Sequence, residues 1–304
     1  MVGSIAFDAV RTPFGARERM LGGSAVHFSL AASFFTSVRV VGPVGDDFGA
    51  AEYAALKERG VDTEDVEHVA GGETFFWRGH YEDDLNTAHT DETRLGVFGD
   101  FEPKLSEASR AAEMVFLGNI QPDLQRRVRE QCAGARLVAL DSMNLWIETA
   151  RESLERTIAG VDLVLMNDTE IRMLTGDPSR IGAARAVMAL GPRAVVAKLG
   201  EYGAALYTGA DFFALPAYPL ESVQDPTGAG DSFAGGFLGY LASQGEGAPD
   251  DESQLRRAMT YGSVLASFCV ERFGTERVRE LDRSQIDARF DEFRRMTALE
   301  SVPA

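Results

Sequence analysis

The feature that most constrains the fold is a series of short apolar segments that alternate with longer helical patterns. Four such segments, rich in Val, Leu and Ala, lie at Met114–Leu117, Leu137–Leu140, Leu163–Met166 and Ala194–Ala197. Segments this short and this uniformly apolar are typical of strands that are covered on both faces. Strands that alternate with helices predict a mainly parallel sheet between two helical layers. We therefore expect an α/β fold with ligands at the carboxyl ends of the strands.

The amino-terminal part of the chain continues this pattern before two segments interrupt it. Strands are predicted at residues 2–7 and 38–42, and helices at 24–35 and 48–59. Residues 11–20 follow the first strand directly, and residues 74–93 alternate aromatic with polar residues without a helical period. We expect these two segments, about 10–20 and 73–95, to form extended ribbons that project from a single domain of residues 1–304. An edge hairpin or a dimer contact is the alternative for the second ribbon.

The run from Asp225 to Phe237 places small residues at the start of a helical pattern, with one carboxylate, Asp231, at its mouth. The first N–H groups of a helix lack intrahelical partners and carry partial positive charge, so they bind phosphate. A carboxylate beside a phosphate suggests a base that takes a proton from an attacking hydroxyl. A tight turn capped by an acid would explain Gly-Ala-Gly alone. Because each helical glycine costs about 1 kcal/mol relative to alanine, the further glycines 235, 236 and 239 indicate a helix face that packs very closely.

Two motifs resemble the signatures of the ribokinase, or pfkB-type, carbohydrate kinases. Residues 225–231 (Asp-Pro-Thr-Gly-Ala-Gly-Asp) are similar to the C-terminal signature, with Pro226 as a minor departure. Residues 21–27, in which a Gly-Gly pair opens a helix, resemble the N-terminal signature. The resemblance spans Gly3 to about Gly274. It implies a ribokinase-like three-layer α/β/α domain whose two ribbons form a small β lid, which would exclude water from the transferred phosphoryl group.

The resemblance also implies roles for individual residues. Asp231 would be the catalytic base, and the backbone of Gly228, Ala229 and Gly230 would form the anion hole. Thr227 is placed on the ATP side, and Asp225 would help to hold a monovalent cation, K⁺ or Na⁺. The helical segment 261–272 would line the adenine pocket.

Four residues are expected to bind the acceptor: Asp8, Gly22, Gly23 and His27. Asp8 lies at the predicted end of the first strand, where a short acceptor suits sugar hydroxyls, and the family commonly has a substrate-binding Asp there. An ordinary strand-end turn residue is the alternative. The two glycines allow a ligand to approach the backbone. His27 stands where most sugar kinases of the family have Asn, so it replaces that Asn, indicates a different substrate, or is a satisfied structural histidine.

Two further segments are expected to bind ATP, the phosphoryl donor, and we call their side of the site the donor side. Residues 167–170 (Asn-Asp-Thr-Glu) match the family's Asn-x-x-Glu motif, which implies that Glu170 holds Mg²⁺ through waters and that Asn167 donates toward phosphate. An N-cap at Asp168 would explain the same residues. The turn that contains Gly200 and Gly203 resembles the family's nucleotide-binding turn. Lys198 before it would lie near the ATP phosphates or, alternatively, at the surface.

Composition limits the partners. The chain has 304 residues with 30 Lys and Arg against 47 Asp and Glu, a net charge of −17, which disfavours nucleic acid and anionic membranes. Cys132 and Cys269 lack metal-ligand spacing and are predicted to be buried free thiols, which fits a reducing cytoplasm. We find neither a secretory signal nor a stretch long enough to span a membrane, and expect a cytoplasmic protein. A homodimer through the lid is left open.

The sequence therefore predicts an ATP-dependent kinase that transfers the γ-phosphoryl group to a hydroxymethyl group of a sugar or sugar-like molecule. ATP and Mg²⁺ are the expected cofactors, with K⁺ implied by the resemblance. A nucleoside kinase of the same family, acting on adenosine, inosine or cytidine, is the alternative, because the ribose 5′-hydroxyl is comparable. Phe75, Phe76 and Trp77 could then stack on the base, although they could equally close over a sugar or pack in a dimer.

Other functions are disfavoured by particular residues. A phosphosugar acceptor needs cations, and the lid offers no basic cluster beyond Arg78 and Arg94. A non-catalytic sugar- or nucleotide-binding protein would not need Asp231 beside an intact anion hole. The hypothesis of a Rossmann dehydrogenase has still less support, because the first strand is not followed by Gly-x-Gly-x-x-Gly.

Overall fold

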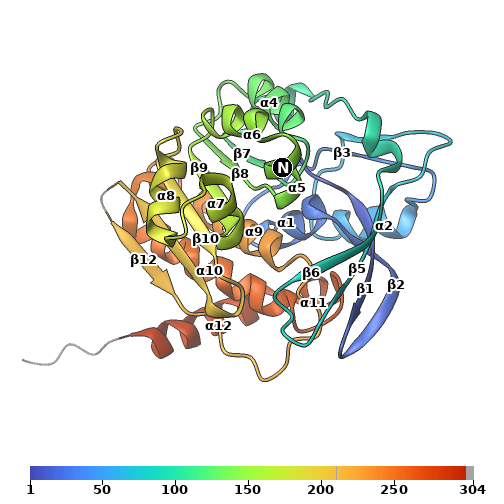
Figure 1. Cartoon of the computed structure of the whole chain (residues 1–304). Coiled ribbons are helices and arrows are strands. Elements are labelled where there is room, and N and C mark those ends of the chain that lie inside the picture. Colours follow the sequence, from blue (N-terminus) through green and yellow to red (C-terminus); the bar gives the residue numbers. More distant parts are fainter. Residues whose placement is uncertain (210, 299–304) are drawn as a thin grey trace, which may run out of the picture.

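A six-stranded sheet forms the centre of the protein in the computed structural model, which describes residues 1–209 and 211–298 (Figure 1). Its order is β12-β11-β10-β9-β8-β7. Strands β7 to β10 run parallel, and β11 and β12 continue the sheet antiparallel. The four predicted apolar strands are confirmed as β7 to β10. The strands are β7 (Met114–Leu117), β8 (Leu137–Leu140), β9 (Leu163–Asn167), β10 (Ala194–Lys198), β11 (Ala204–Thr208) and β12 (Phe212–Leu215).

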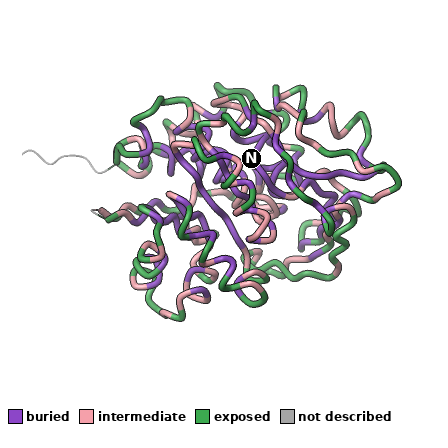
Figure 2. The backbone as a smooth tube through the Cα atoms, turned by 90° about the horizontal axis from the view of Figure 1, so that it is seen from above, coloured by how far each residue is buried: buried purple, intermediate pink, exposed green. Residues whose placement is uncertain are grey.

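Alternate residues of this sheet enter two different hydrophobic cores. Leu163 and Leu165 of β9 belong to one core, and Val164 and Met166 belong to the other, as expected for a strand covered on both faces. The first core is covered by α1 (Ser24–Ala32), α9 (Ala229–Ser243), α10 (Glu252–Cys269) and α12 (Arg283–Thr297). The second is covered by α4 (Pro122–Gln131), α5 (Asn144–Thr149), α6 (Arg151–Ile158), α7 (Asp168–Thr175) and α8 (Arg180–Met188). The predicted three-layer α/β/α architecture is therefore confirmed, and Figure 2 shows buried backbone through its middle.

The two ribbons lie in one four-stranded sheet of order β2-β1-β5-β6, beside the main body of the molecule (Figure 1). Strand β1 pairs parallel with β5, and β2 and β6 pair antiparallel at the two edges. We refer to this sheet as the lid sheet. Its strands are β1 (Ala6–Thr12), β2 (Gly15–Gly22), β5 (Phe75–Tyr81) and β6 (Ala88–Arg94).

The prediction of one continuous first strand over residues 2–7 is wrong. Val2 forms only isolated bridges, to Leu117 and Val41, at the edge of the central layer. The chain then leaves that layer, and from Ala6 it runs as β1 of the lid sheet. Asp8 consequently lies within a strand rather than at its end. The sequence does not reveal this change of sheet, because apolar residues are buried both in the central layer and in the lid sheet.

The remaining elements are short and connect these layers. A two-stranded parallel sheet of β3 and β4 lies beyond Val2 and Val41. The connection between α9 and α10 contains the 3₁₀ turn η3. No helix among the described residues is both long and apolar enough to cross a membrane. These elements are β3 (Gly42–Val44), β4 (Val66–His68), α2 (Ala50–Lys57), α3 (Glu107–Arg110), α11 (Glu276–Glu280), η1 (Gly96–Asp100), η2 (Gly200–Tyr202) and η3 (Ala248–Asp250).

Helix α9 is packed between α1 and α10 through its glycines, as predicted. A Cβ on Gly235 would lie 2.8 Å from the Cβ of Ala31, and one on Gly239 would lie 2.9 Å from the Cα of Ala32, both in or beside α1. On the α10 side, a Cβ on Gly236 would lie 2.7 Å from the carbonyl oxygen of Tyr261. These distances are too short for any side chain, so the glycines set how closely the three helices approach.

We expect Gly236→Ala to lower the free energy of unfolding by about 1–3 kcal/mol, because α9 and α10 must separate to admit the methyl group. The gain in helix propensity, about 1 kcal/mol, offsets only part of this strain. Urea denaturation measures the difference. Gly134→Ala is the matched control, since a Cβ there meets nothing within 4 Å. Equal stability of the two variants would contradict the packing role of Gly236.

Candidate active site

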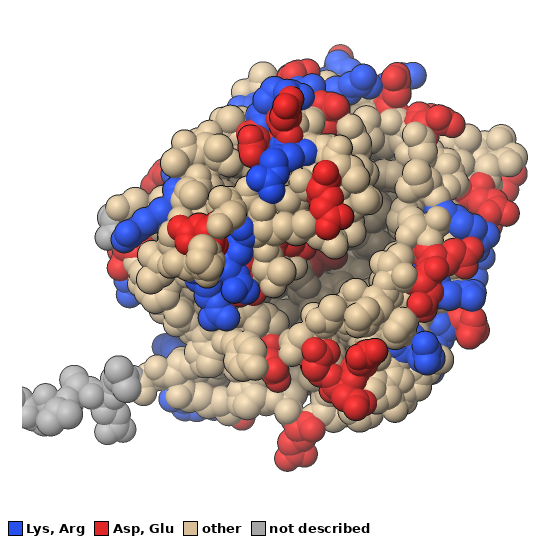
Figure 3. Space-filling view, viewed as in Figure 1, with Lys and Arg blue, Asp and Glu red and all other residues tan. Residues whose placement is uncertain are grey.

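Four charged side chains meet where β8, β9 and β10 end and α9 begins. Asp141 follows β8, Glu170 lies in the first turn of α7, Lys198 ends β10, and Asp231 lies in the first turn of α9. The charges of Asp141 and Lys198 act on the pKa of both Glu170 and Asp231. The carboxyl ends of parallel strands place side chains from distant segments at one edge. Figure 3 shows that the surface is hollowed on the viewed face, with acidic atoms inside the hollow.

Residues 225–230, which we call the signature loop, lead into and begin α9, and they expose backbone N–H groups next to Asp231. Gly228 is the N-cap with φ 77°, a left-handed conformation that favours glycine. In the described part of the chain, no backbone carbonyl accepts from the N–H groups of Gly228, Gly230 or Asp231, whereas the N–H of Ala229 donates to Pro226 O at 3.2 Å. The predicted anion hole therefore has free donors at Gly228 and Gly230, and the donor of Ala229 is already used.

The pKa of the Asp231 carboxyl lies near neutral pH. Burial raises the pKa of this carboxyl to about 7, and the negative charge of Asp141 adds to the shift, while Lys198 opposes it. The residue is only partly covered, as are Gly228 to Gly230, so a ligand can reach all of them. A carboxyl with a pKa near the working pH can both accept and release a proton.

Lys198 is held over this loop by Asp141. Its Nζ lies 2.5 Å from Asp141 Oδ2, and the second oxygen of Asp141 accepts from the N–H of Ser142 at 2.8 Å. Burial alone would lower the pKa of Lys198, but the surrounding carboxylates, Asp141 first, raise it above its usual value, so the ammonium stays charged. A Cβ on Gly230 would lie only 3.1 Å from Nζ. Lys198 thus lies beside the helix N-terminus, and the alternative of an exposed surface lysine is wrong.

Asn167 and Glu170 form a reciprocal capping box at the start of α7. Asn167 Oδ1 accepts from the N–H of Glu170, and Glu170 Oε2 accepts from the N–H of Asn167, both at 2.8 Å. The N-cap is therefore Asn167 and not Asp168, which instead pairs with Arg172 and Arg180. The cap leaves the amide nitrogen of Asn167 and one oxygen of Glu170 for a ligand. Burial, followed by the charge of Asp141, raises the pKa of Glu170 to about 8.

Asp8 and the Gly-Gly pair lie together at the base of the lid sheet. Asp8 is buried, and its Oδ2 accepts from the N–H of Gly23 at 3.3 Å. Any Cβ on Gly22 would overlap the carboxylate of Asp8, so this approach requires glycine. Burial raises the pKa of Asp8 to about 7, with contributions from the charges of Asp225 and Asp231.

His27 lies beneath the signature loop. The side chain is buried, and its ring would collide with any Cβ on Gly228. Nδ1 lies 3.8 Å from the Sγ of Cys269, and Nε2 has no hydrogen-bond partner in the described residues. Burial lowers the pKa of His27 to about 4, so the ring is neutral. This position supports the loop from within, and contact with the acceptor stays a prediction.

Asp225 is a fully buried carboxylate at the start of the signature. Oδ1 accepts from the N–H of Thr227 and Oδ2 from the N–H of Gly274, both at 2.9 Å. Burial raises the pKa of Asp225. Each oxygen keeps a lone pair, so the group retains capacity for a hard cation.

The turn after Lys198 contains the other two glycines. Gly200 and Gly203 both have positive φ, 59° and 102°, and they enclose η2 between β10 and β11. The N–H of Leu199 donates to Gly203 O at 2.8 Å, which closes the turn. Any Cβ on Gly203 would collide with the backbone of Leu215 and Pro216. Packing therefore already requires glycine at 203, whatever the turn binds.

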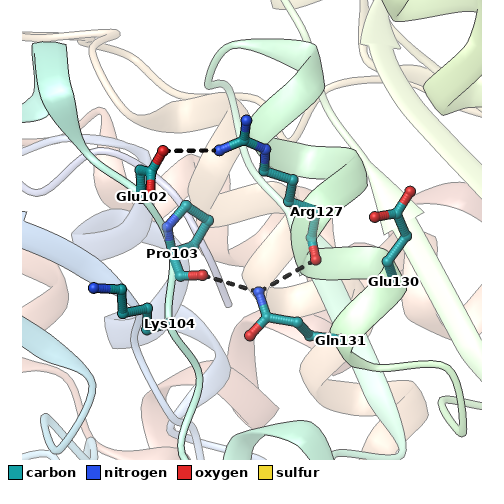
Figure 4. Close-up of a pocket in the computed structure, with 6 residues that line it drawn as sticks. All are labelled: Glu102, Pro103, Lys104, Arg127, Glu130 and Gln131. Atoms are coloured by element: carbon teal, nitrogen blue, oxygen red, sulfur yellow. Dashed lines mark hydrogen bonds and ion pairs between the residues drawn. The ribbon is translucent and has the colours of Figure 1, made fainter.

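Two surface pockets lie outside this cluster. The one in Figure 4 has a volume of about 320 Å³ and lies between residues 102–104 and α4. Its polar groups largely bind one another: Arg127 pairs with Glu102 at 3.3 Å, and Gln131 Nε2 donates to Pro103 O at 2.9 Å. The other, about 360 Å³, lies beside β3 and η1. No predicted site residue lines either pocket, so the charged cluster remains the candidate site.

Asp141 is the residue of this charged cluster that the sequence prediction missed. It directly follows the predicted strand Leu137–Leu140, and the expectation that ligands bind at the carboxyl ends of the strands applies to it. The predicted buried free thiols, Cys132 and Cys269, are confirmed.

Comparisons with known proteins agree with this geometry. A family model described as pfkB family carbohydrate kinase matches residues 10–280. The cytidine kinase of Thermococcus kodakarensis is 29% identical over 92% of this chain and 94% of that protein. The nucleoside kinase of Methanothermobacter thermautotrophicus is 28% identical over 90% of each.

Solved structures show the same fold. The Burkholderia thailandensis nucleoside kinase in complex with inosine has a TM-score of 0.78 at 22% identity, with 96% of both chains covered. The ribokinase from Giardia lamblia has a TM-score of 0.77 at 21% identity and covers 94% of this chain and 98% of that chain. The predicted ribokinase-like fold is therefore confirmed. Because the family model covers most of its length, the chain belongs to the pfkB family of carbohydrate kinases and is an ATP-dependent phosphotransferase acting on a hydroxyl group.

Proposed function

We propose that Asp231 is the catalytic base of this kinase. Its carboxylate accepts the proton of the acceptor hydroxyl as that oxygen attacks the γ-phosphorus of ATP. The free N–H groups of Gly228 and Gly230 and the ammonium of Lys198 then stabilise the charge on the transferred phosphoryl group. The observation that carries this proposal is one carboxylate beside free helix N-terminal donors, with a charged lysine over the same loop.

Two other carboxylates, Glu170 and Asp225, are suited to binding cations. One free oxygen of Glu170 offers the hard ligand that Mg²⁺ prefers, directly or through water, and Asn167 can donate toward phosphate. Bound Mg²⁺ would neutralise and orient the phosphates. The buried Asp225 carboxylate would hold K⁺ or Na⁺, since each of its oxygens keeps a lone pair beside the hydrogen bond that it accepts from the N–H of Thr227 or Gly274. Thr227, Gly200 and Gly203 are proposed to contact ATP.

We further propose that the acceptor is a nucleoside, phosphorylated at its 5′-hydroxyl. Trp77 pairs with Asp8 in the parallel register of β5 and β1, so both side chains lie on the same face of the lid sheet. The indole lies over Gly79, and its Nε1 donates to Thr90 at 3.1 Å. An aromatic face fixed beside the proposed sugar-binding carboxylate suits a base attached to a ribose.

The other two aromatic residues of this segment are occupied. Phe75 packs edge-on against Phe98, and Phe76 is buried beneath the guanidinium groups of Arg78 and Arg94. Among the three, Trp77 is therefore the one proposed to stack on a base. The cytidine and nucleoside kinases among the relatives support the same choice.

A coupled ADP-release screen tests the acceptor class. We expect kcat/KM for cytidine, adenosine or inosine to exceed that for ribose, fructose and other free sugars at least about tenfold, and Trp77→Ala to remove most of that preference. Stacking on one aromatic side chain is worth roughly 1–3 kcal/mol, enough for this ratio. A free hexose used as well as the best nucleoside would return the chain to the sugar kinases.

The pKa of Asp231 predicts the pH dependence of the reaction. Only the deprotonated carboxylate can accept a proton, so kcat/KM for ATP, measured at subsaturating acceptor so that it reports the free enzyme, should rise roughly tenfold per pH unit up to about pH 7 and then level off. Asp141→Asn removes a negative charge that raises this pKa, so the rising limb should move to lower pH. A pH–rate profile measures both. A limb near pH 4 in the wild type would contradict this environment for the base.

Location and assembly belong to the same proposal. Two buried free thiols suit the reducing cytoplasm, and we propose that location.

The lid sheet is proposed to close over the acceptor and exclude water. A homodimer through the lid stays a prediction. Light scattering of the purified protein would test it.

A further inference from the structure

The end of the lid sheet touches the signature loop through Tyr81, the last residue of β5. Thr227 Oγ1 donates to the hydroxyl oxygen of Tyr81 at 3.3 Å. Thr227 is fixed in turn, because its N–H donates to Asp225 at 2.9 Å and its carbonyl accepts from the Sγ of Cys269 at 3.5 Å. Burial raises the pKa of Tyr81 above its usual value, so the phenol stays neutral. The residue after Thr227 is Gly228, so this contact joins the lid sheet to the proposed anion hole.

The turn between β5 and β6 makes a second contact, with the turn between β10 and β11. Asn86 Nδ2 donates to Glu201 Oε1 at 3.0 Å, and Asn86 Oδ1 accepts from the N–H of Glu201 at 3.4 Å. A Cβ on Gly200 would lie 2.6 Å from Asn86 Oδ1, and the positive φ of 59° also favours glycine at this position. The carboxylate of Asp84 accepts from the N–H of Asn86 at 3.2 Å and orders the turn.

A third contact supports the same docking from the neighbouring strand. Thr12, the last residue of β1, donates through its hydroxyl to Gln224 O at 2.8 Å. Thr12 is buried. The ends of β1 and β5 and the β5–β6 turn therefore all meet segments proposed to serve the donor side or lying next to them. None of these contacts involves the acceptor residues Asp8 and Gly22.

We propose that Tyr81 and Asn86 form a latch that closes the lid sheet onto the ATP side of the site. The proposal rests on the assignment of Thr227 and Gly200 to ATP. A closed latch orders the segments around both residues before ATP binds. By linkage, bound ATP must then favour the closed lid by the same factor by which the closed lid favours ATP. Tyr81 and Asn86 are positioning residues in this scheme, because they act through Thr227 and the Gly200 turn.

Hydrogen–deuterium exchange of residues 75–94 tests the latch in the free protein. We expect Tyr81→Phe and Asn86→Ala each to speed exchange there about three- to tenfold, since losing one such contact is worth roughly 0.5–1.5 kcal/mol of local stability. Tyr240→Phe is a matched control, because it also removes a tyrosine hydroxyl bond, to Gln254 at 2.6 Å, but in the helical layer. Asp83→Ala is the control within the turn, since its exposed side chain makes no hydrogen bond to described residues. Exchange of residues 75–94 that is equal in the wild type, Tyr81→Phe and Asn86→Ala would overturn the latch.

A second measurement tests the coupling to nucleotide. Adding Mg²⁺ and the non-hydrolysable analogue AMP-PNP should slow exchange of residues 82–88 several-fold in the wild type and less than about twofold in Asn86→Ala, while the Kd of AMP-PNP from calorimetry rises by no more than about tenfold. If AMP-PNP binds the wild type but leaves this exchange unchanged, the coupling is wrong and the donor assignment stands. If calorimetry shows no binding to the wild type, the ATP assignment itself is wrong, and with it the coupling.

Discussion

Asp231→Asn is expected to lower kcat by roughly 10²–10⁴-fold, the usual range for removal of a general base. Asparagine keeps the volume and polarity of the side chain but cannot take a proton at neutral pH. The backbone donors of Gly228 and Gly230 and the ammonium of Lys198 stay in place, so some activity should remain. The ADP-release assay measures kcat, and Asp83→Asn, a change of an exposed acid in the lid turn, should leave it unchanged. A kcat within about threefold of the wild type would exclude Asp231 as the base.

The same variant should be no less stable than the wild type, which separates loss of a base from loss of the fold. Burial and Asp141 raise the folded pKa of Asp231 to about 7, above its unfolded value. A group with a raised folded pKa contributes stability at low pH and loses it as the pH rises through the folded value. Asparagine carries no charge at any of these pH values. We therefore expect the Tm of Asp231→Asn to equal or exceed that of the wild type at pH 8, with a smaller difference at pH 5.

Lys198→Met is expected to lower kcat/KM for ATP by roughly 10²–10³-fold, the scale on which removal of one group that stabilises a transition-state charge acts. Methionine fills a similar volume without the ammonium. The variant should also lose about 3 kcal/mol or more of stability at neutral pH, because Asp141 is left buried without its partner at 2.5 Å. Losing the lysine raises the pKa of Asp141 further, so this loss of stability should shrink as the pH falls.

The double variant Lys198→Met/Asp141→Asn separates the two effects. Removing both charges should restore most of the stability, since replacing both partners of a buried pair is far less costly than breaking the pair. It should not restore activity, because the cation is still missing. Thermal unfolding and the ADP-release assay on the four proteins complete the cycle. Recovery of activity in the double variant would mean that Lys198 only neutralises Asp141.

The sequence was informative where a local pattern has one physical reading. The apolar runs that became β7 to β10 are too short for helices and alternate with helical patterns, and the glycines at 235, 236 and 239 indicate a helix face in close contact. The run at 225–231 likewise combines a left-handed glycine, a helix start and an acid within seven residues. Each of these features is complete within a short stretch of chain, so no long-range contact had to be known.

The remaining features depend on where distant segments meet. The change of sheet after Ile5 is invisible in an apolar run, which is why Asp8 was expected at a strand end. The N-cap is Asn167 because α7 begins at Asp168. A sequence pattern does not locate the start of a helix to within one residue. Tyr81 and Thr227 are 146 positions apart, and nothing in either local pattern indicates that they touch. Asp141 could have been found, because it follows a correctly predicted strand.

The glycine contacts of α9 have a consequence for any attempt to redesign this enzyme. At positions 235, 236 and 239 the backbone of α9 lies against α1 or α10 and leaves no space for a larger side chain. Libraries that vary these positions should therefore yield mostly unfolded clones. Mutational tolerance should be higher on the edge strand β6, most of whose residues are exposed.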